Sequence, residues 1–75
     1  MMAETVRSEL NAIVWKIEVV VGKAVAEGDT LMILESMKME IPVAAPRAGT
    51  VKTLLVAEGE QVAEGQALAV LESGS

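Results

Sequence analysis

Apolar residues along this chain recur in short runs, with glycines and polar residues between them. The runs at residues 14–20, 31–34 and 68–71 are too short for buried helices and are typical of strands. After residue 38, Met39, Ile41 and Val43 alternate with other positions, which indicates a strand with one buried face. The glycines lie where turns would separate these runs. The pattern therefore predicts an all-β domain.

Helical signals are weak in comparison. Residues 4–10 could form one helical turn, and residues 62–65 are too few for a helix. Pro42 and Pro46 fit an edge strand or a strand end, where a missing backbone N–H is tolerated. Neither observation changes the expected fold class.

The chain also repeats itself, because residues 14–36 resemble residues 51–73 at a constant offset of 37. Gly28 recurs as Gly65, and both follow the tripeptide Val-Ala-Glu. Two units are fewer than a solenoid needs, and each is too small to bury its own apolar face. We therefore expect one sandwich or flattened barrel of two short-stranded sheets with a pseudo-twofold axis. The expected shared core is Val25, Leu31, Leu34, Val62, Leu68 and Leu71.

The two repeats differ in how they end. Both close with Leu-Glu-Ser, but the first continues through Met37 and Lys38, whereas the second stops at Gly74-Ser75. The connection after the first repeat is therefore a hairpin without a counterpart. By pseudo-symmetry it should lie opposite the chain end, with Lys38 exposed at its tip.

The sequence Glu35-Ser36-Met37-Lys38-Met39-Glu40 resembles the modified-lysine motif of the biotinyl domains of biotin carboxyl carrier proteins. Gly28-Asp29 before the motif and Ala48-Gly49-Thr50-Val51 after it also resemble that family, and the likeness extends from about residue 8 to residue 71. The small bacterial biotin/lipoyl attachment proteins are similar in length. The resemblance implies a barrel-sandwich carrier domain at residues 8–73, with tails at residues 1–7 and 74–75.

The resemblance further implies that a biotin protein ligase attaches biotin covalently to Lys38. The biotin would then move as a swinging arm and carry carboxyl groups between a biotin carboxylase and a carboxyltransferase. A lysine amine is mostly protonated near neutral pH, with a reference pKa of about 10.4, so the ligase must remove a proton. Nothing in the chain suits that task. We therefore expect a carrier without catalytic residues, not an enzyme.

Four residues around the lysine are candidates for recognition by the ligase and by partner enzymes. Met37 and Met39 have flexible, polarisable side chains that adapt to different surfaces, although Met39 could instead fill a gap at the sheet edge. Glu35 and Glu40 are expected to be solvated flanks of the hairpin that the ligase reads. An acid–base pair is disfavoured, because no further catalytic groups accompany them in the sequence.

Composition narrows the range of partners. The chain has a formal net charge of −5, contains no cysteine or histidine, and has Trp15 as its only aromatic residue. These counts exclude disulfides and thiolate or imidazole metal sites, and they disfavour nucleic acid as a partner. Lys16 and Glu18 interrupt the most apolar segment, which is too short to span a membrane. We expect a cytosolic monomer.

Two alternatives remain open at this stage. A lipoyl domain also modifies a hairpin lysine, but lipoyl domains usually have an acidic residue where this chain has Met37. An unmodified adaptor module would share the fold without using the lysine. The departures from the repeat also carry expectations: Gly49, matched by Ala12 in the first half, could have a positive φ. Trp15, matched by Lys52, is expected to face outward and to pack against the N-terminal segment.

Overall fold

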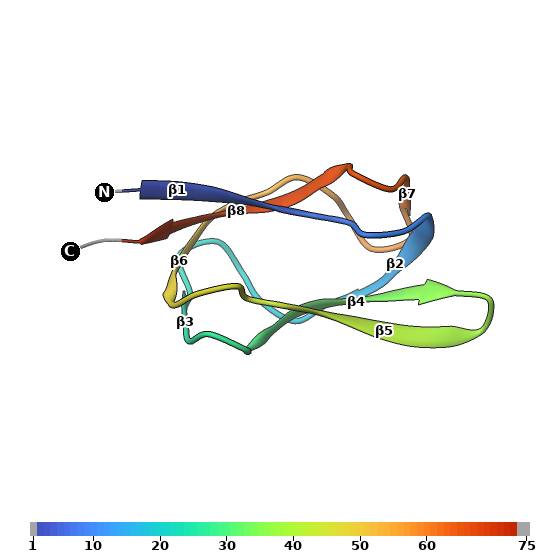
Figure 1. Cartoon of the computed structure of the whole chain (residues 1–75). Coiled ribbons are helices and arrows are strands. Elements are labelled where there is room, and N and C mark those ends of the chain that lie inside the picture. Colours follow the sequence, from blue (N-terminus) through green and yellow to red (C-terminus); the bar gives the residue numbers. More distant parts are fainter. Residues whose placement is uncertain (1, 74–75) are drawn as a thin grey trace.

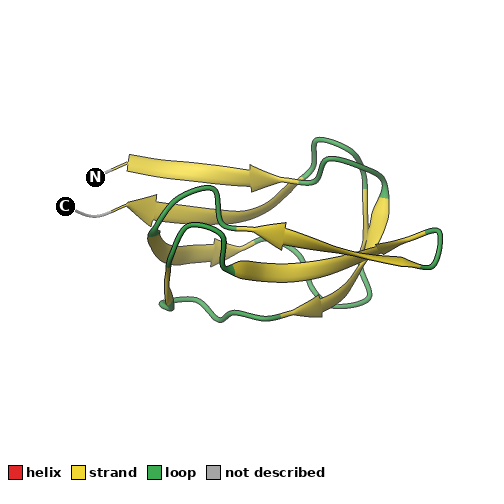
Figure 2. Cartoon of the chain, turned by 60° about the horizontal axis from the view of Figure 1, so that its bottom comes forward, coloured by secondary structure: helices red, strands yellow, loops and turns green. Residues whose placement is uncertain are grey.

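The computed structural model describes residues 2–73, which form two four-stranded antiparallel sheets (Figure 1). The strands are β1 (Met2–Arg7), β2 (Ala12–Ile17), β3 (Ala24–Val25), β4 (Thr30–Ser36), β5 (Met39–Ala44), β6 (Gly49–Leu54), β7 (Gln61–Val62) and β8 (Ala67–Ser73). One sheet has the order β1-β8-β6-β3 and the other has the order β5-β4-β2-β7. Strands and loops account for all of residues 2–73, as Figure 2 shows. The predicted all-β fold of two short-stranded sheets is confirmed.

The 37-residue repeat is visible in the pairing of the strands. The second sheet reads like the first when β1 is replaced by β5, β8 by β4, β6 by β2 and β3 by β7. The hydrogen bonds between the two halves also occur in equivalent pairs. The amide of Gly22 donates to the carbonyl of Val51, the amide of Gly59 donates to the carbonyl of Val14, and both distances are 2.7 Å. The pseudo-twofold axis therefore relates both the strands and the contacts between the two halves.

The N-terminal segment differs from the sequence-based expectation. Residues 1–7 were expected to be a tail, and residues 4–10 showed a weak helical signal. Instead, Met2–Arg7 is strand β1 and pairs with β8 along its whole length. The reason is the duplication: β8 needs an edge partner just as β4 needs β5, and the two pairs share the same register. The predicted tail at 74–75 lies outside the described residues.

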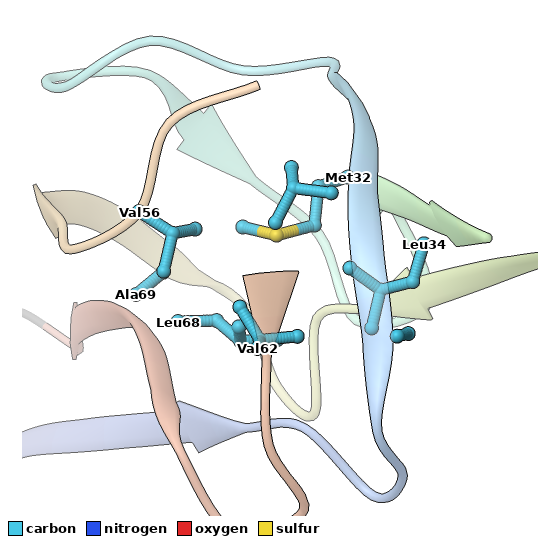
Figure 3. Packing of buried hydrophobic residues seen from close by; sticks show 8 residues of the cluster. Met32, Leu34, Val56, Val62, Leu68 and Ala69 are labelled. Carbon is cyan, nitrogen blue, oxygen red and sulfur yellow. The ribbon is translucent and has the colours of Figure 1, made fainter. Parts of the chain in front are cut away.

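The core consists of two apolar clusters, and each draws on both halves of the chain. In one cluster, Met32 and Leu34 of β4 pack against Val56, Val62, Leu68 and Ala69 from the second half (Figure 3). The other cluster is its pseudo-symmetric counterpart, made of Val6, Val19, Val25, Leu31, Ala45, Val51 and Leu71. All six predicted core residues are buried. Because the halves interlock, neither half could bury its apolar residues alone.

Gly49 is required for a different reason from the one expected. It is not among the residues with positive φ. An added Cβ would instead lie 2.9 Å from the carbonyl oxygen of Glu72, so β6 and β8 approach closely at this point. In the other sheet, Ala12 occupies the equivalent place as a buried residue. The first half therefore holds a side chain at position 12 for which the second half has no room at position 49.

The domain is elongated, with principal extents of 39 × 18 × 17 Å. The β4–β5 hairpin forms one end, and both ends of the described chain lie at the other (Figure 1). The hairpin thus lies opposite the chain ends, as predicted from the repeat. None of residues 2–73 belongs to a helix, so the described chain has no helix that could cross a membrane.

Candidate functional site

The turn between β4 and β5 is as short as a hairpin turn can ordinarily be. Ser36 pairs with Met39, which leaves only Met37 and Lys38 in the loop. Both residues have positive φ angles, 52° for Met37 and 66° for Lys38. This is the combination of a type I′ turn, whose twist matches that of the flanking strands. The two-residue length of the turn is thus set by the pairing of β4 with β5.

The same turn is unfavourable for its own sequence. Type I′ turns favour Asn-Gly, because for most other residues the left-handed backbone conformation is less favourable by roughly 1–2 kcal/mol. Met37 and Lys38 are the only non-glycine residues with positive φ in the part of the chain described. Backbone strain of this kind is typical of functional sites. Sequence reasoning placed the lysine at the tip but did not anticipate this strain.

Lys38 is fully available at the tip. Its side chain is exposed, and it takes part in none of the ion pairs or side-chain hydrogen bonds found within residues 2–73. Its base is rigid because Leu34, four residues earlier, is completely buried in the core. An amine held this way can enter the active site of another protein without any rearrangement of its own domain.

Both methionines flanking the lysine are exposed. Met37 has 89% of its surface accessible and Met39 has 60%. Met39 lies on the same side of β5 as Ile41 and Val43, which are partly buried, so the predicted alternation is present. At the end of the strand, however, the side chain extends beyond the core. Both thioethers are therefore exposed to solvent, and the gap-filling alternative for Met39 is disfavoured.

Glu35 and Glu40 lie directly opposite each other on β4 and β5, one pair below the turn. Both are exposed, and neither belongs to an ion pair found among residues 2–73. Like charges in directly opposed positions destabilise a sheet slightly. The structure therefore unites the five residues singled out from the sequence, with two unneutralised carboxylates below the lysine.

Other features of the surface do not converge on Lys38. A cleft of about 550 Å³ lies between β1 and β5, and its lining includes Val6, Ser8, Ile41 and Val43 but not Lys38. Residues 2–73 contain no group of three or more acidic side chains that could hold a metal ion. The tip therefore presents the lysine amine on an exposed turn, away from this cleft.

Comparison with known proteins identifies the family to which this chain belongs. The family model described as "Biotin-requiring enzyme" matches residues 1–71. The chain is 46% identical over 70 residues to a protein of Mycobacterium leprae named "Biotinylated protein TB7.3 homolog", covering 93% of this chain and 99% of that one. It is 43% identical over 56 residues to the "Biotin/lipoyl attachment protein" of Bacillus subtilis, covering 75% of this chain and 77% of that one.

A solved structure agrees with the sequence comparisons. The urea carboxylase of Kluyveromyces lactis contains a segment that superimposes with a TM-score of 0.90 at 36% identity, covering 96% of this chain but only 6% of the carboxylase. The predicted resemblance, the fold and biotin as the cofactor of the family are thereby confirmed. This chain belongs to the biotin/lipoyl attachment family and has the fold of the biotinyl domains of carboxylases.

Proposed function

We propose that this chain is a biotin carrier, with biotin joined by an amide bond to Nζ of Lys38. The observation that carries the proposal is the position of Lys38: exposed, unpaired within residues 2–73, and second in a strained two-residue turn at the far end of the domain. The only group that this chain must contribute to the amide is a free amine, so the site fits the cofactor without any preformed pocket.

The chain's own part in modification is to present the amine. A biotin protein ligase would supply both the activated biotinyl group and the base that removes a proton from Nζ. The exposed flanks Glu35, Met37, Met39 and Glu40 are proposed to be the residues that the ligase reads. Glu35 and Glu40, the acidic residues that flank Lys38, belong to the strands below the turn, and we assign the base to the ligase instead.

The modified domain is proposed to act as a mobile carrier between a biotin carboxylase and a carboxyltransferase. Biotin, when bound, supplies the ureido ring that holds the carboxyl group. The protein supplies a compact body whose hairpin projects away from both ends of the described chain. Tethering the cofactor in this way raises its effective concentration at each active site. A cytosolic location remains a prediction.

The carrier role can be tested with the modified protein. Biotinylated domain is incubated with a biotin carboxylase, ATP and ¹⁴C-bicarbonate, and label on the protein is counted after gel filtration. The unmodified domain and the Lys38→Arg variant serve as controls. The proposal predicts label only on the biotinylated domain. Equal labelling of all three proteins, or of none, would contradict the carrier role.

Lipoylation is the second candidate function, favoured by one observation: the relative in Bacillus subtilis is named a "Biotin/lipoyl attachment protein". Both modifications would use the same amine on the same turn. The two are distinguished by offering the chain to a biotin protein ligase and to a lipoyl ligase under equal conditions and comparing the initial rates.

A further inference from the structure

The duplication gives this domain two equivalent outer faces, one on each sheet, and the two faces differ in character. On the sheet that contains the hairpin, the outward residues are Ile13, Trp15, Lys16, Ile33, Glu35, Glu40 and Pro42, here called the hairpin face. At the equivalent positions the other sheet has Thr50, Lys52, Thr53, Val70, Glu72, Ala3 and Thr5. Each face thus serves as an internal control for the other.

Trp15 is the most pronounced difference. It lies at a β-bulge, where the pairing of β2 with β4 shifts between Val14 and Lys16. A bulge leaves its extra residue unpaired and changes the direction of its side chain. Trp15 is 49% exposed and its neighbour on the face, Ile13, is 43% exposed. The expected outward orientation is confirmed, but packing against the N-terminal segment is wrong, because β1 belongs to the opposite sheet.

The exchange of lysine for tryptophan also changes the ion pairs of the face, because Lys16 lies beside Trp15 but pairs with Glu18. In the other sheet, Nζ of Lys52 lies 3.5 Å from a carboxylate oxygen of Glu72. Trp15 stands at the equivalent of Lys52, and Glu35 at the equivalent of Glu72, so this ion pair has no counterpart on the hairpin face. Glu40 adds a second carboxylate where the other sheet has only alanine.

An exposed tryptophan beside isoleucine, bordered by unneutralised carboxylates, has the composition of the centre and rim of a protein interface. We propose that the hairpin face binds the biotin protein ligase through a surface of complementary chemistry, an apolar patch bordered by lysine or arginine. The inference rests on the proposed function and goes beyond it, because it assigns recognition to a sheet face below the hairpin.

Distance favours the ligase over the later partners. An unmodified lysine reaches an active site only by the length of its own stem, so the ligase must approach the hairpin closely. A specific interface covers about 800 Å² on each partner, a patch with a radius of roughly 16 Å. Ile13 lies opposite Glu35, three residues from Lys38, and strand residues rise about 3.3 Å each. Ile13 is therefore within the ligase footprint, and Trp15, next to the Lys16–Ile33 pair, is near its edge at roughly 16 Å from Lys38 along the strand. The partners that act on biotin can stand off by the length of its arm.

The test copies the second half of the chain into the first. Trp15→Lys and Ile13→Thr, alone and combined, place on the hairpin face the residues that the other sheet already accommodates at equivalent positions. Folding is therefore expected to survive, and thermal unfolding checks it. The matched control is Lys52→Ala on the opposite face. Steady-state biotinylation by a purified bacterial biotin protein ligase, with carrier concentration varied, gives kcat and KM for each variant.

We expect Trp15→Lys to lower kcat/KM at least about tenfold, mainly through KM, and Lys52→Ala to leave it within about twofold. Raising salt should increase KM for the unaltered chain and have less effect on a Glu35→Gln/Glu40→Gln variant. An unchanged KM for the combined variant would overturn the inference while leaving the proposed function intact. So would an equal loss in the Lys52→Ala control, or a loss confined to later labelling by biotin carboxylase. Absence of biotin on the unaltered chain would instead refute the proposed function itself.

Discussion

Truncation of Leu34 to alanine tests how the hairpin is anchored to the core. Leu34 is completely buried, packs in the cluster with Met32 and Leu68, and lies two residues before the end of β4. The change removes three carbon atoms, which is about 2.4 kcal/mol of transfer free energy at roughly 0.8 kcal/mol per methylene. An incompletely collapsed cavity adds to this, so the expected total is about 2–5 kcal/mol.

That loss is large for a domain of this size. At roughly 0.05–0.15 kcal/mol per residue, a chain of 75 residues has a free energy of unfolding of about 4–11 kcal/mol. Leu71, 1% exposed, is the pseudo-symmetric counterpart of Leu34 in the other cluster. Leu71→Ala should therefore cost a similar amount, within about 1 kcal/mol.

Urea unfolding followed by far-UV circular dichroism gives both values, provided that the m-value stays constant. A loss below about 1 kcal/mol for Leu34→Ala would refute its place in the core. A large cost for one leucine and a negligible cost for the other would refute the energetic equivalence of the two clusters.

Three further predictions concern the backbone and the turn. Gly49→Ala should lower the free energy of unfolding by about 1–3 kcal/mol, because the added Cβ would lie 2.9 Å from the carbonyl oxygen of Glu72. A fall in the melting temperature of less than roughly 2 °C would contradict the close approach of β6 and β8. Lys38→Gly should raise the free energy of unfolding by about 0.5–1 kcal/mol, because glycine adopts the left-handed conformation without strain. The same change should abolish modification. A lower free energy of unfolding in urea would argue against a type I′ turn. Glu40→Thr should raise the free energy of unfolding by about 0.2–1 kcal/mol at low salt, because it removes a like-charge cross-strand pair. This gain should shrink in roughly 0.5 M salt. A gain independent of salt would exclude charge repulsion as its cause.

Much of this architecture could be predicted because the duplication shows the same pattern of apolar and turn residues twice. Val25 and Val62, for example, occupy equivalent slots, and both are buried. The hairpin tip followed from the same comparison, since Met37 and Lys38 come directly after the Leu-Glu-Ser that closes the first repeat. Periodicity and turn glycines were sufficient for the fold class, because short strands on two sheets leave few other ways to bury these residues.

Strand β1 was not predicted because its sequence has little similarity to that of β5. At the 37-residue offset, Met2–Arg7 aligns with Met39–Ala44, but only Met2 and Val6 find identical residues. Those two matches were the available signal. The bulge at Trp15 and the close approach at Gly49 depend on how neighbouring strands pair, and a single strand's sequence does not reveal its register.

The opposition of Glu35 and Glu40 has a similar origin. Sequence identified both as flanks of the lysine, but only the two-residue turn makes them direct cross-strand partners. The same register places Ser36 opposite Met39 and so fixes the positive φ of both turn residues. Strain and clustered charge at the tip are thus consequences of pairing rather than of local preference.

The central claim, that Lys38 is the residue that receives biotin, is tested most directly by intact mass. The chain is co-expressed with a biotin protein ligase and, in parallel, with a lipoyl ligase, and the Lys38→Arg variant is treated identically. The account predicts a single biotinyl increment on the unaltered chain and none on the variant. A biotinyl increment that persists in Lys38→Arg, or its absence from both proteins, would contradict the claim, and a lipoyl increment alone would replace carboxyl transfer with acyl transfer on the same lysine.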